Sequence, residues 1–185
     1  MPFRNDREHH GRVWSVVLLS LIATFAVPAA ALATESIPRT CNEMSFKGIA
    51  QMMDAAGNFE TRLVLLAKKH PAGDDEGSTA SEMEEINIGT LRNALGEVTG
   101  YLLAAENLAA MRDLMVEEHD RATLERQFKL VAQQIQEPLS FGLDSAESVS
   151  AMTKRPAISA EVSKIHDFMD ETRAHFAACA GLGKH

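Results

Sequence analysis

Apolar residues recur every three or four positions along most of this chain, as in helices that bury one face. The first such stripe begins near residue 42, and its steps alternate between three and four residues. The resulting period of about 3.5 is typical of helices packed nearly parallel to one another. The stripe consists of Ile49, Met52, Ala56, Phe59, Leu63 and Leu66. Pro71 ends this helix, because proline disfavours helical backbone at the residue before it.

A second stripe of the same period follows a polar loop at residues 74–78. Thr79 or Ser81 is placed to cap its helix, and Ser81 with Glu84 three residues later forms a capping-box pattern. The apolar positions are Ile88, Leu91, Leu95, Val98, Leu102, Ala105 and Ala109. Three glycines lie between them: Gly89, Gly96 and Gly100. Each glycine costs about 1 kcal/mol relative to alanine in a helix, so we expect a close approach of another helix there.

The pattern shifts near residues 117–120 and then continues helically towards Pro138. Whether residues 79–138 form one bent helix or two stays open at this point. Gly142 is predicted to lie in a loop, followed by a short helix that ends before Pro156. The last helix is expected to begin near Ser159 and to end at the glycines that follow Ala180.

No stretch alternates between apolar and polar residues as a half-buried strand does. The fold predicted is therefore all-α, an up-down four-helix bundle with one extra short helix or kink. Such a bundle brings the first and last helix ends to the same pole. Cys41 and Cys179 lie at those ends.

The two cysteines are predicted to form a terminal disulfide that clasps the bundle, because an even cysteine count is typical of exported chains with disulfides. Closing so long a loop stabilises a fold by about 5 kcal/mol in the chain-entropy model. Free or metal-bound thiols are the alternative, but Cys41 and Cys179 lack the short spacing of a metal motif.

Export is indicated by the N-terminus. Residues 1–12 carry three arginines, residues 13–33 carry no charge, and Pro28 interrupts the apolar run. Small residues at Ala31 and Ala33 fit a signal peptidase site, so cleavage is predicted after Ala33. The uncharged run is about as long as a spanning helix, and a retained membrane anchor is the alternative.

Cleavage would leave one domain, residues 34–185, in the periplasm or secreted. No later segment is long and apolar enough to span a bilayer, so we expect no stable membrane insertion after cleavage. The net charge is −8 for the whole chain. Residues 1–33 contribute one net positive charge, three arginines against two acidic residues, so the mature domain carries −9. Such a domain lacks the basic surface that nucleic-acid binding needs.

Motifs of known chemistry are absent from the sequence. No histidine follows a glutamate by three positions, as di-metal carboxylate bundles require. Haem-attachment, zincin, nucleophile-elbow and phosphate-loop patterns are also missing. We therefore expect neither an enzyme nor a bound cofactor.

One constellation offers soft metal ligands. Met111, Met115 and His119 are spaced by four residues, so a continuous helix would present two thioethers and an imidazole on one face. Thioethers suit copper(I), although methionines at helical spacing are ordinary core residues.

Two further pairs are spaced by four residues, His166 with Asp170 and Glu171 with His175. Either pair could serve a metal or a proton transfer, but exposed ion pairs explain them equally well. The acidic run at residues 74–76 lacks the spacing of a calcium loop.

The sequence thus favours a non-enzymatic binding or interaction protein of the periplasm, whose partner is another protein or a small ligand. A copper-binding protein using Met111, Met115 and His119 is the alternative. An exposed contact patch is expected around residues 102–115, where the apolar stripe is broadest.

Overall fold

The structure is a computed structural model that describes residue 41 and residues 44–69, 79–115 and 117–182. Its contacts divide the chain into Met1–Thr34 and Glu35–His185. The first unit, which holds the predicted signal segment, lies outside the described residues, so its cleavage or retention stays a prediction. The predicted loop at residues 74–78 lies outside them as well.

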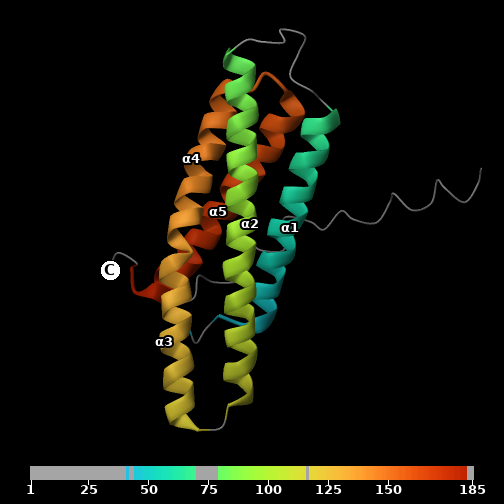
Figure 1. Cartoon of the computed structure of the whole chain (residues 1–185). Helices are drawn as coiled ribbons and strands as arrows, with labels where there is room; N and C mark the ends of the chain where they lie inside the picture. The colour runs from blue at the N-terminus through green and yellow to red at the C-terminus, as the bar shows by residue number, and fades with distance from the viewer. Residues whose placement is uncertain (1–40, 42–43, 70–78, 116, 183–185) are drawn as a thin grey trace, which may run out of the picture. The chain divides into compact units, whose positions relative to one another are not determined.

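Within the part that is described, regular structure is helical, which confirms the all-α prediction. The helices are α1 (Phe46–Lys69), α2 (Thr79–Leu114), α3 (Glu118–Gln134), α4 (Gln136–Met152) and α5 (Pro156–Ala180). Four of them form a ring in which α1 contacts α2, α2 contacts α4, α4 contacts α5, and α5 contacts α1. Figure 1 shows these helices running up and down side by side, as the predicted bundle requires.

The extra element of the bundle is a kink between α3 and α4. Ile135 joins them with near-helical backbone angles, and hydrogen bonds run across the join from Ile135 N to Val131 O and from Leu139 N to Ile135 O. Pro138 explains the kink, since proline lacks the N–H that would bond four residues back and its ring crowds that carbonyl. Residues 118–152 therefore form one bent rod.

Gly142 was expected in a loop, and this expectation is wrong. It lies inside α4 and is buried where α4 crosses α2 and α5. A Cβ at this position would collide with the Met169 sulfur and lie 3.2 Å from the Ala94 Cβ. Glycine is thus used here for close helix packing and not to end a helix.

The helix boundaries differ from the prediction in two further places. The second helix, α2, begins at Thr79, so Ser81 lies within its first turn and is not the N-cap of a capping box. The last helix begins at Pro156 and not at Ser159, because proline is favoured in the first turn of a helix, where no N–H is needed. Its end agrees with the prediction: Gly181 adopts a left-handed φ of 74° directly after Ala180.

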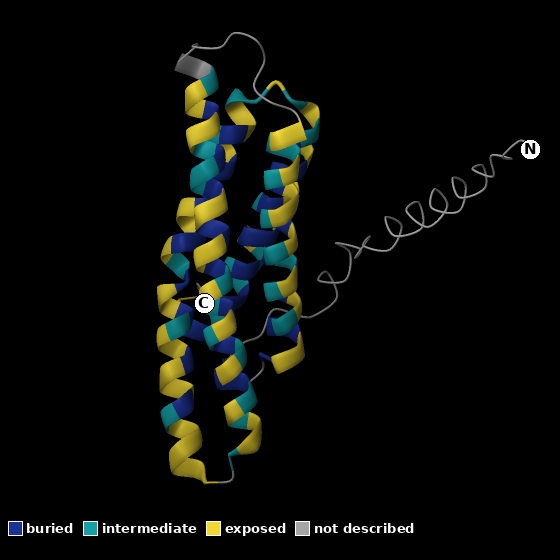
Figure 2. Ribbon diagram, turned by 45° about the vertical axis from the view of Figure 1, so that its right-hand side comes forward, coloured by how far each residue is buried: buried dark blue, intermediate teal, exposed yellow. Residues whose placement is uncertain are grey.

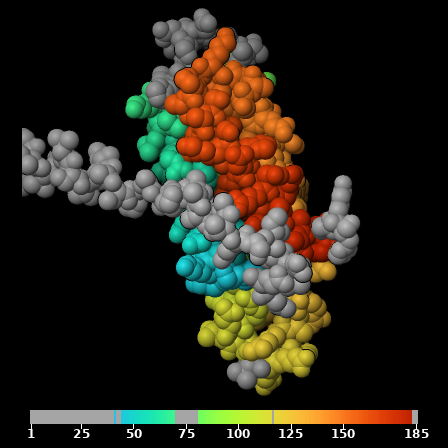
Figure 3. Space-filling model, turned by 180° about the vertical axis from the view of Figure 1, so that it is seen from behind, coloured from blue at the N-terminus to red at the C-terminus, as the bar shows by residue number. Residues whose placement is uncertain are grey.

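The rods of the bundle differ in length. The 36 residues of α2 span about 54 Å, whereas the 24 residues of α1 span about 36 Å. Figure 1 shows the consequence: the end where α2 turns into α3 extends beyond the start of α1 and the end of α5. The same projection is visible from behind in Figure 3.

Residues 79–138 do not form one continuous bent helix, because the chain turns between two helices. The first, α2, ends at Leu114 and α3 begins at Glu118. The two helices pack against each other as a hairpin. We call its distal part, residues 108–115 and 117–125, the hairpin end.

Candidate functional site

The predicted disulfide is present and lies where the hairpin end leaves the bundle. Cys41 and Cys179 are bonded, with their Cα atoms 4.3 Å apart. Both residues are buried. The bond joins the segment before α1 to the last turn of α5, so it holds the start of α1 against the end of α5.

Arg112 fixes the same segment to α2. Its guanidinium donates hydrogen bonds to the carbonyl oxygens of Cys41, at 3.0 Å, and Met44, at 3.1 Å. It also pairs with the Asp113 carboxylate at 3.1 Å. The base of the hairpin end is therefore tied to the disulfide by charge-assisted hydrogen bonds.

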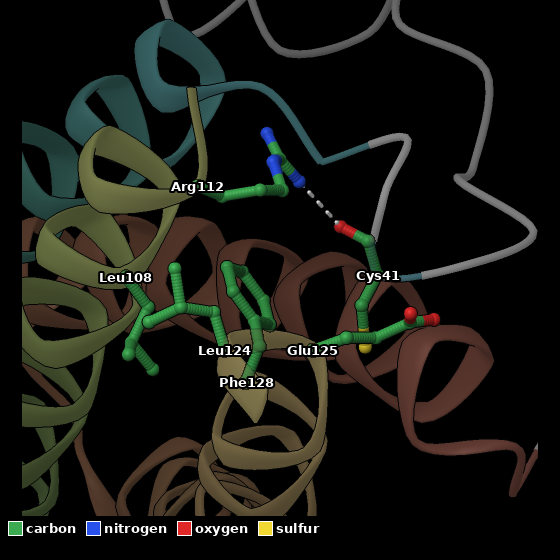
Figure 4. A pocket seen from close by; sticks show the side chains of 6 residues that line it. All are labelled: Cys41, Leu108, Arg112, Leu124, Glu125 and Phe128. Atoms are coloured by element: carbon green, nitrogen blue, oxygen red, sulfur yellow. Dashed lines mark hydrogen bonds between the residues drawn. The ribbon is translucent and has the colours of Figure 1, made fainter. Parts of the chain in front are cut away.

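A shallow hollow lies beside this anchor. Its lining, drawn in Figure 4, comes from the disulfide segment, α2 and α3: Cys41, Leu108, Arg112, Leu124, Glu125 and Phe128. The space is about 180 Å³ including the open solvent above it. Pockets that enclose small molecules are typically about 300–1,000 Å³, so this hollow is too small for most of them.

The hairpin end exposes apolar side chains beyond the hollow. Leu114 is 81% exposed and Met111 is 40% exposed. Figure 2 shows this end mostly in the colours of exposed and half-buried residues. The patch lies in the range 102–115 expected from the sequence, although Leu102 itself is buried.

Acidic residues lie close in sequence to these apolar side chains. Asp113 and Glu117 lie at the turn, and Glu118 and Asp120 lie in the first turn of α3. Glu117, Glu118 and Asp120 lie at the N-terminal end of α3, where carboxylates interact favourably with the helix dipole, which gives them a structural role as well.

The three candidate copper ligands do not lie on one helical face. The premise of a continuous helix is wrong, because α2 ends at Leu114 and His119 belongs to α3. Only Met111 and Met115 keep their spacing, with Met115 N bonded to Met111 O at 3.1 Å. The copper site itself stays a prediction.

The two histidine–carboxylate pairs lie in different surroundings. His166 faces Glu147 and Asp167, at 3.8 and 3.7 Å, while Asp170 pairs with Arg173. His175 is buried in the core, and Glu171 is half-buried. Among the described residues, no three histidine, cysteine, aspartate or glutamate side chains are grouped to hold a metal ion.

Two buried glutamates were missed by the sequence interpretation. Glu84 on α2 pairs with Arg155 at 3.0 Å, and Glu161 on α5 pairs with Arg62 at 2.6 Å. A signal was available, since Glu84 precedes Ile88 by four residues and Glu161 precedes Ile165 by four. A charge in register with an apolar stripe predicts a buried ion pair.

The glycines of α2 do not have the role predicted for them. A Cβ at Gly89, Gly96 or Gly100 would meet nothing within 4 Å. No helix of the described chain packs closely there, and the unfavourable helix propensity of three glycines has no compensation within the bundle.

Comparison with known proteins gave no relative. No family model, curated protein or solved structure matches this chain. None of the helices in the described ranges combines the length and apolarity needed to cross a membrane.

Proposed function

We propose that this chain is an exported, non-enzymatic interaction protein that binds a partner, another protein or a small ligand, through the hairpin end. The observation that carries the proposal is the exposure of Leu114 and Met111 on a part of the molecule that extends past the rest of the bundle. Leu114 and Met111 are three positions apart and are therefore neighbours on the helix surface. Adjoining exposed apolar residues mark interaction sites, whereas single ones are common on any surface. The Arg112 hydrogen bonds hold the base of the hairpin end in place.

The small size of the hollow at Cys41 supports a protein partner over an enclosed small molecule. The acidic residues near Leu114 favour a partner with a basic rim around an apolar centre. Export is supported by the disulfide, which persists in oxidising compartments.

Site-specific photo-crosslinking tests the contact surface. A photoreactive amino acid replaces Leu114 in the chain produced with its own N-terminus, and the matched control replaces Leu65, which is 60% exposed on α1. We expect a discrete adduct from position 114 and none from position 65. Equal labelling at both positions, or none at 114, would contradict the proposal.

Export is tested on the same material by intact mass. The expected product is residues 34–185 lighter by two hydrogen atoms, because the disulfide removes them. Retention of residues 1–33 or two free thiols would contradict the exported, oxidised form.

Copper(I) titration tests the alternative function. We expect the wild-type chain and a Met111→Leu, Met115→Leu variant to behave alike. Stoichiometric binding that this variant loses would replace our proposal with a metal-carrier function.

A further inference from the structure

The methionines of this chain differ widely in exposure. Three of them are at most 5% exposed and belong to the core: Met44, Met52 and Met169. Met53 and Met152 are half-buried on α1 and α4. At the two ends of α2, Met83 is 45% and Met111 is 40% exposed, and Met115 directly after α2 is half-buried. The chain thus presents thioethers to solvent at both ends of this helix.

Met111 and Met115 lie on the contact surface of the proposed function. Met111 precedes Leu114 by three residues and Met115 by four, and side chains at these spacings are neighbours on a helix. The hydrogen bond from Met115 N to Met111 O, 3.1 Å long, extends the helical turn through Met115. Thioether side chains are flexible and polarisable, which suits a surface that adapts to a partner. The two methionines and Leu114 therefore supply apolar area at the hairpin end.

No free thiol competes with these thioethers for an oxidant. The chain has two cysteines, and both are in the Cys41–Cys179 disulfide. Hydrogen peroxide oxidises a methionine in a two-electron step: the sulfur lone pair attacks one peroxide oxygen, the O–O bond breaks, and the leaving hydroxide takes up the remaining proton as water. The product is a sulfoxide, which is polar where the thioether was apolar.

Burial limits this reaction to the surface of the bundle. Oxidation follows exposure, so the packing around Met52 and Met169 protects their sulfur atoms. The sulfur of Met169 is enclosed so closely that a Cβ added at Gly142 would collide with it. Mild oxidation should therefore leave the core methionines reduced and the bundle folded, while Met111 and Met115 lose their apolar character.

The charges of the hairpin end favour an uncharged oxidant. This part of the chain carries five carboxylates against the two guanidinium groups of Arg112 and Arg121. The net charge of the whole chain is −8. Such a field repels anionic oxidants such as hypochlorite, whereas hydrogen peroxide is neutral and reaches the surface unopposed.

We propose that Met111 and Met115 form an oxidation-sensitive site, at which a neutral peroxide converts the two thioethers to sulfoxides and weakens the partner contact. This inference rests on the proposed function, because the hairpin end must bind a partner for oxidation to weaken the contact. Met83 provides an internal comparison: it is similarly exposed but lies about 42 Å away along α2, at the opposite end of the helix (Figure 1). Oxidation of Met83 should leave the contact unchanged.

The first test locates the oxidised methionines. The purified, disulfide-bonded chain is exposed to a limited amount of hydrogen peroxide, the peroxide is removed, and peptide mass spectrometry measures the oxygen gained at each methionine. We expect Met83 and Met111 to be oxidised first, Met115 next, and Met52 and Met169 last, with an unchanged circular dichroism spectrum. Equal rates of oxidation at Met111 and Met169 would overturn the proposal.

The second test measures the contact through the photoreactive residue at position 114. Untreated and peroxide-treated chains are each mixed with the exported proteins of the cells that produce the chain, so the partner itself is not oxidised. We expect the discrete adduct to fall at least about tenfold after treatment, because burial of one methionine side chain contributes roughly that factor to affinity.

Two variants separate the site from the rest of the chain. In Met111→Leu, Met115→Leu, leucine keeps the apolar volume but has no sulfur to oxidise, so treated and untreated chains should give equal adducts. The control variant Met83→Leu keeps both methionines of the hairpin end. Its adduct should fall on treatment as that of the wild type does.

The outcomes distinguish the two proposals. If the untreated wild-type chain gives no adduct, the proposed function fails and the oxidation-sensitive site fails with it. If the untreated chain gives the adduct and the treated chain gives as much, only the oxidation-sensitive site is overturned. The same conclusion follows if Met111→Leu, Met115→Leu loses its adduct on treatment as fully as the wild type.

Discussion

The clasped part of the bundle is the region where α1, α2, α4 and α5 pack together and the Cys41–Cys179 disulfide joins the chain ends. It and the hairpin end are built from the same kind of helix but are stabilised differently. Around the disulfide and above it, α2 and α4 pack with α1 and α5 as a ring of four, and two ion pairs that each use a buried glutamate connect them. At the hairpin end, α2 and α3 continue past α1 and α5, and Leu114 is exposed to solvent. The clasped part buries most of its large apolar side chains in the core, whereas the hairpin end exposes some of them to solvent.

This difference shows how a helical bundle can expose a contact surface with little loss in its free energy of unfolding. The base of the hairpin end is anchored by Arg112 and by Phe128, which stacks on Phe176 with ring centroids 6.5 Å apart. Substitutions in the clasped part should therefore be costly, and substitutions at the exposed tip should be nearly neutral.

Removal of the disulfide should have the largest effect on the clasped part. Because the bond spans 138 residues of sequence, its loss lowers the free energy of unfolding by about 5 kcal/mol. Urea unfolding of the wild-type chain with and without reductant measures this without altering core packing. A change below about 1 kcal/mol would mean that the unfolded chain is not constrained by the bond.

Arg155→Met should have the next largest effect. It leaves Glu84 buried without its ion-pair partner and lowers the free energy of unfolding by about 3–5 kcal/mol. The control is Arg92→Met, which breaks the exposed pair with Glu60 and should cost about 0.5 kcal/mol or less. Equal losses in the two variants would show that burial does not distinguish these pairs.

Gly142→Ala should destabilise the bundle by about 1–3 kcal/mol, because the added methyl group overpacks the contact with Ala94 and Met169. Gly57→Ala is the matched change in open space and should stabilise α1 by up to about 1 kcal/mol. Thermal unfolding of both variants compares them directly. A stabilised Gly142→Ala would show that the crossing of α4 with its neighbours has room to spare.

Leu114→Asp should have the smallest effect, a change of about 0.5 kcal/mol or less in the free energy of unfolding. The physical reason is its exposure, since almost no apolar area is lost from the core. Leu102→Ala, at a fully buried position of the same helix, should cost about 2–5 kcal/mol. If Leu114→Asp proved as costly as Leu102→Ala, the hairpin end would belong to the core.

The apolar pattern predicted much of the fold, because a helix buries one face and repeats it at a fixed period. The stripes at Ile49–Leu66 and Ile88–Ala109 fall within α1 and α2, and Gly181 ends α5 as expected. Gly142 was misjudged, because local chemistry marks it as a helix breaker. Its packing against Ala94 and Met169 keeps α4 continuous through it.

The sequence by itself determined the helical class, the positions of the apolar faces and the cysteine pair at the two ends of the domain, because these depend on local periodicity and residue type. The tertiary structure alone decided which elements reach furthest and what each face meets. The projection of the hairpin end follows from the unequal lengths of α1 and α2 once they pack antiparallel. The burial of Glu84 and the openness beside Gly96 and Gly100 likewise depend on neighbours distant in sequence, and no local pattern contains them.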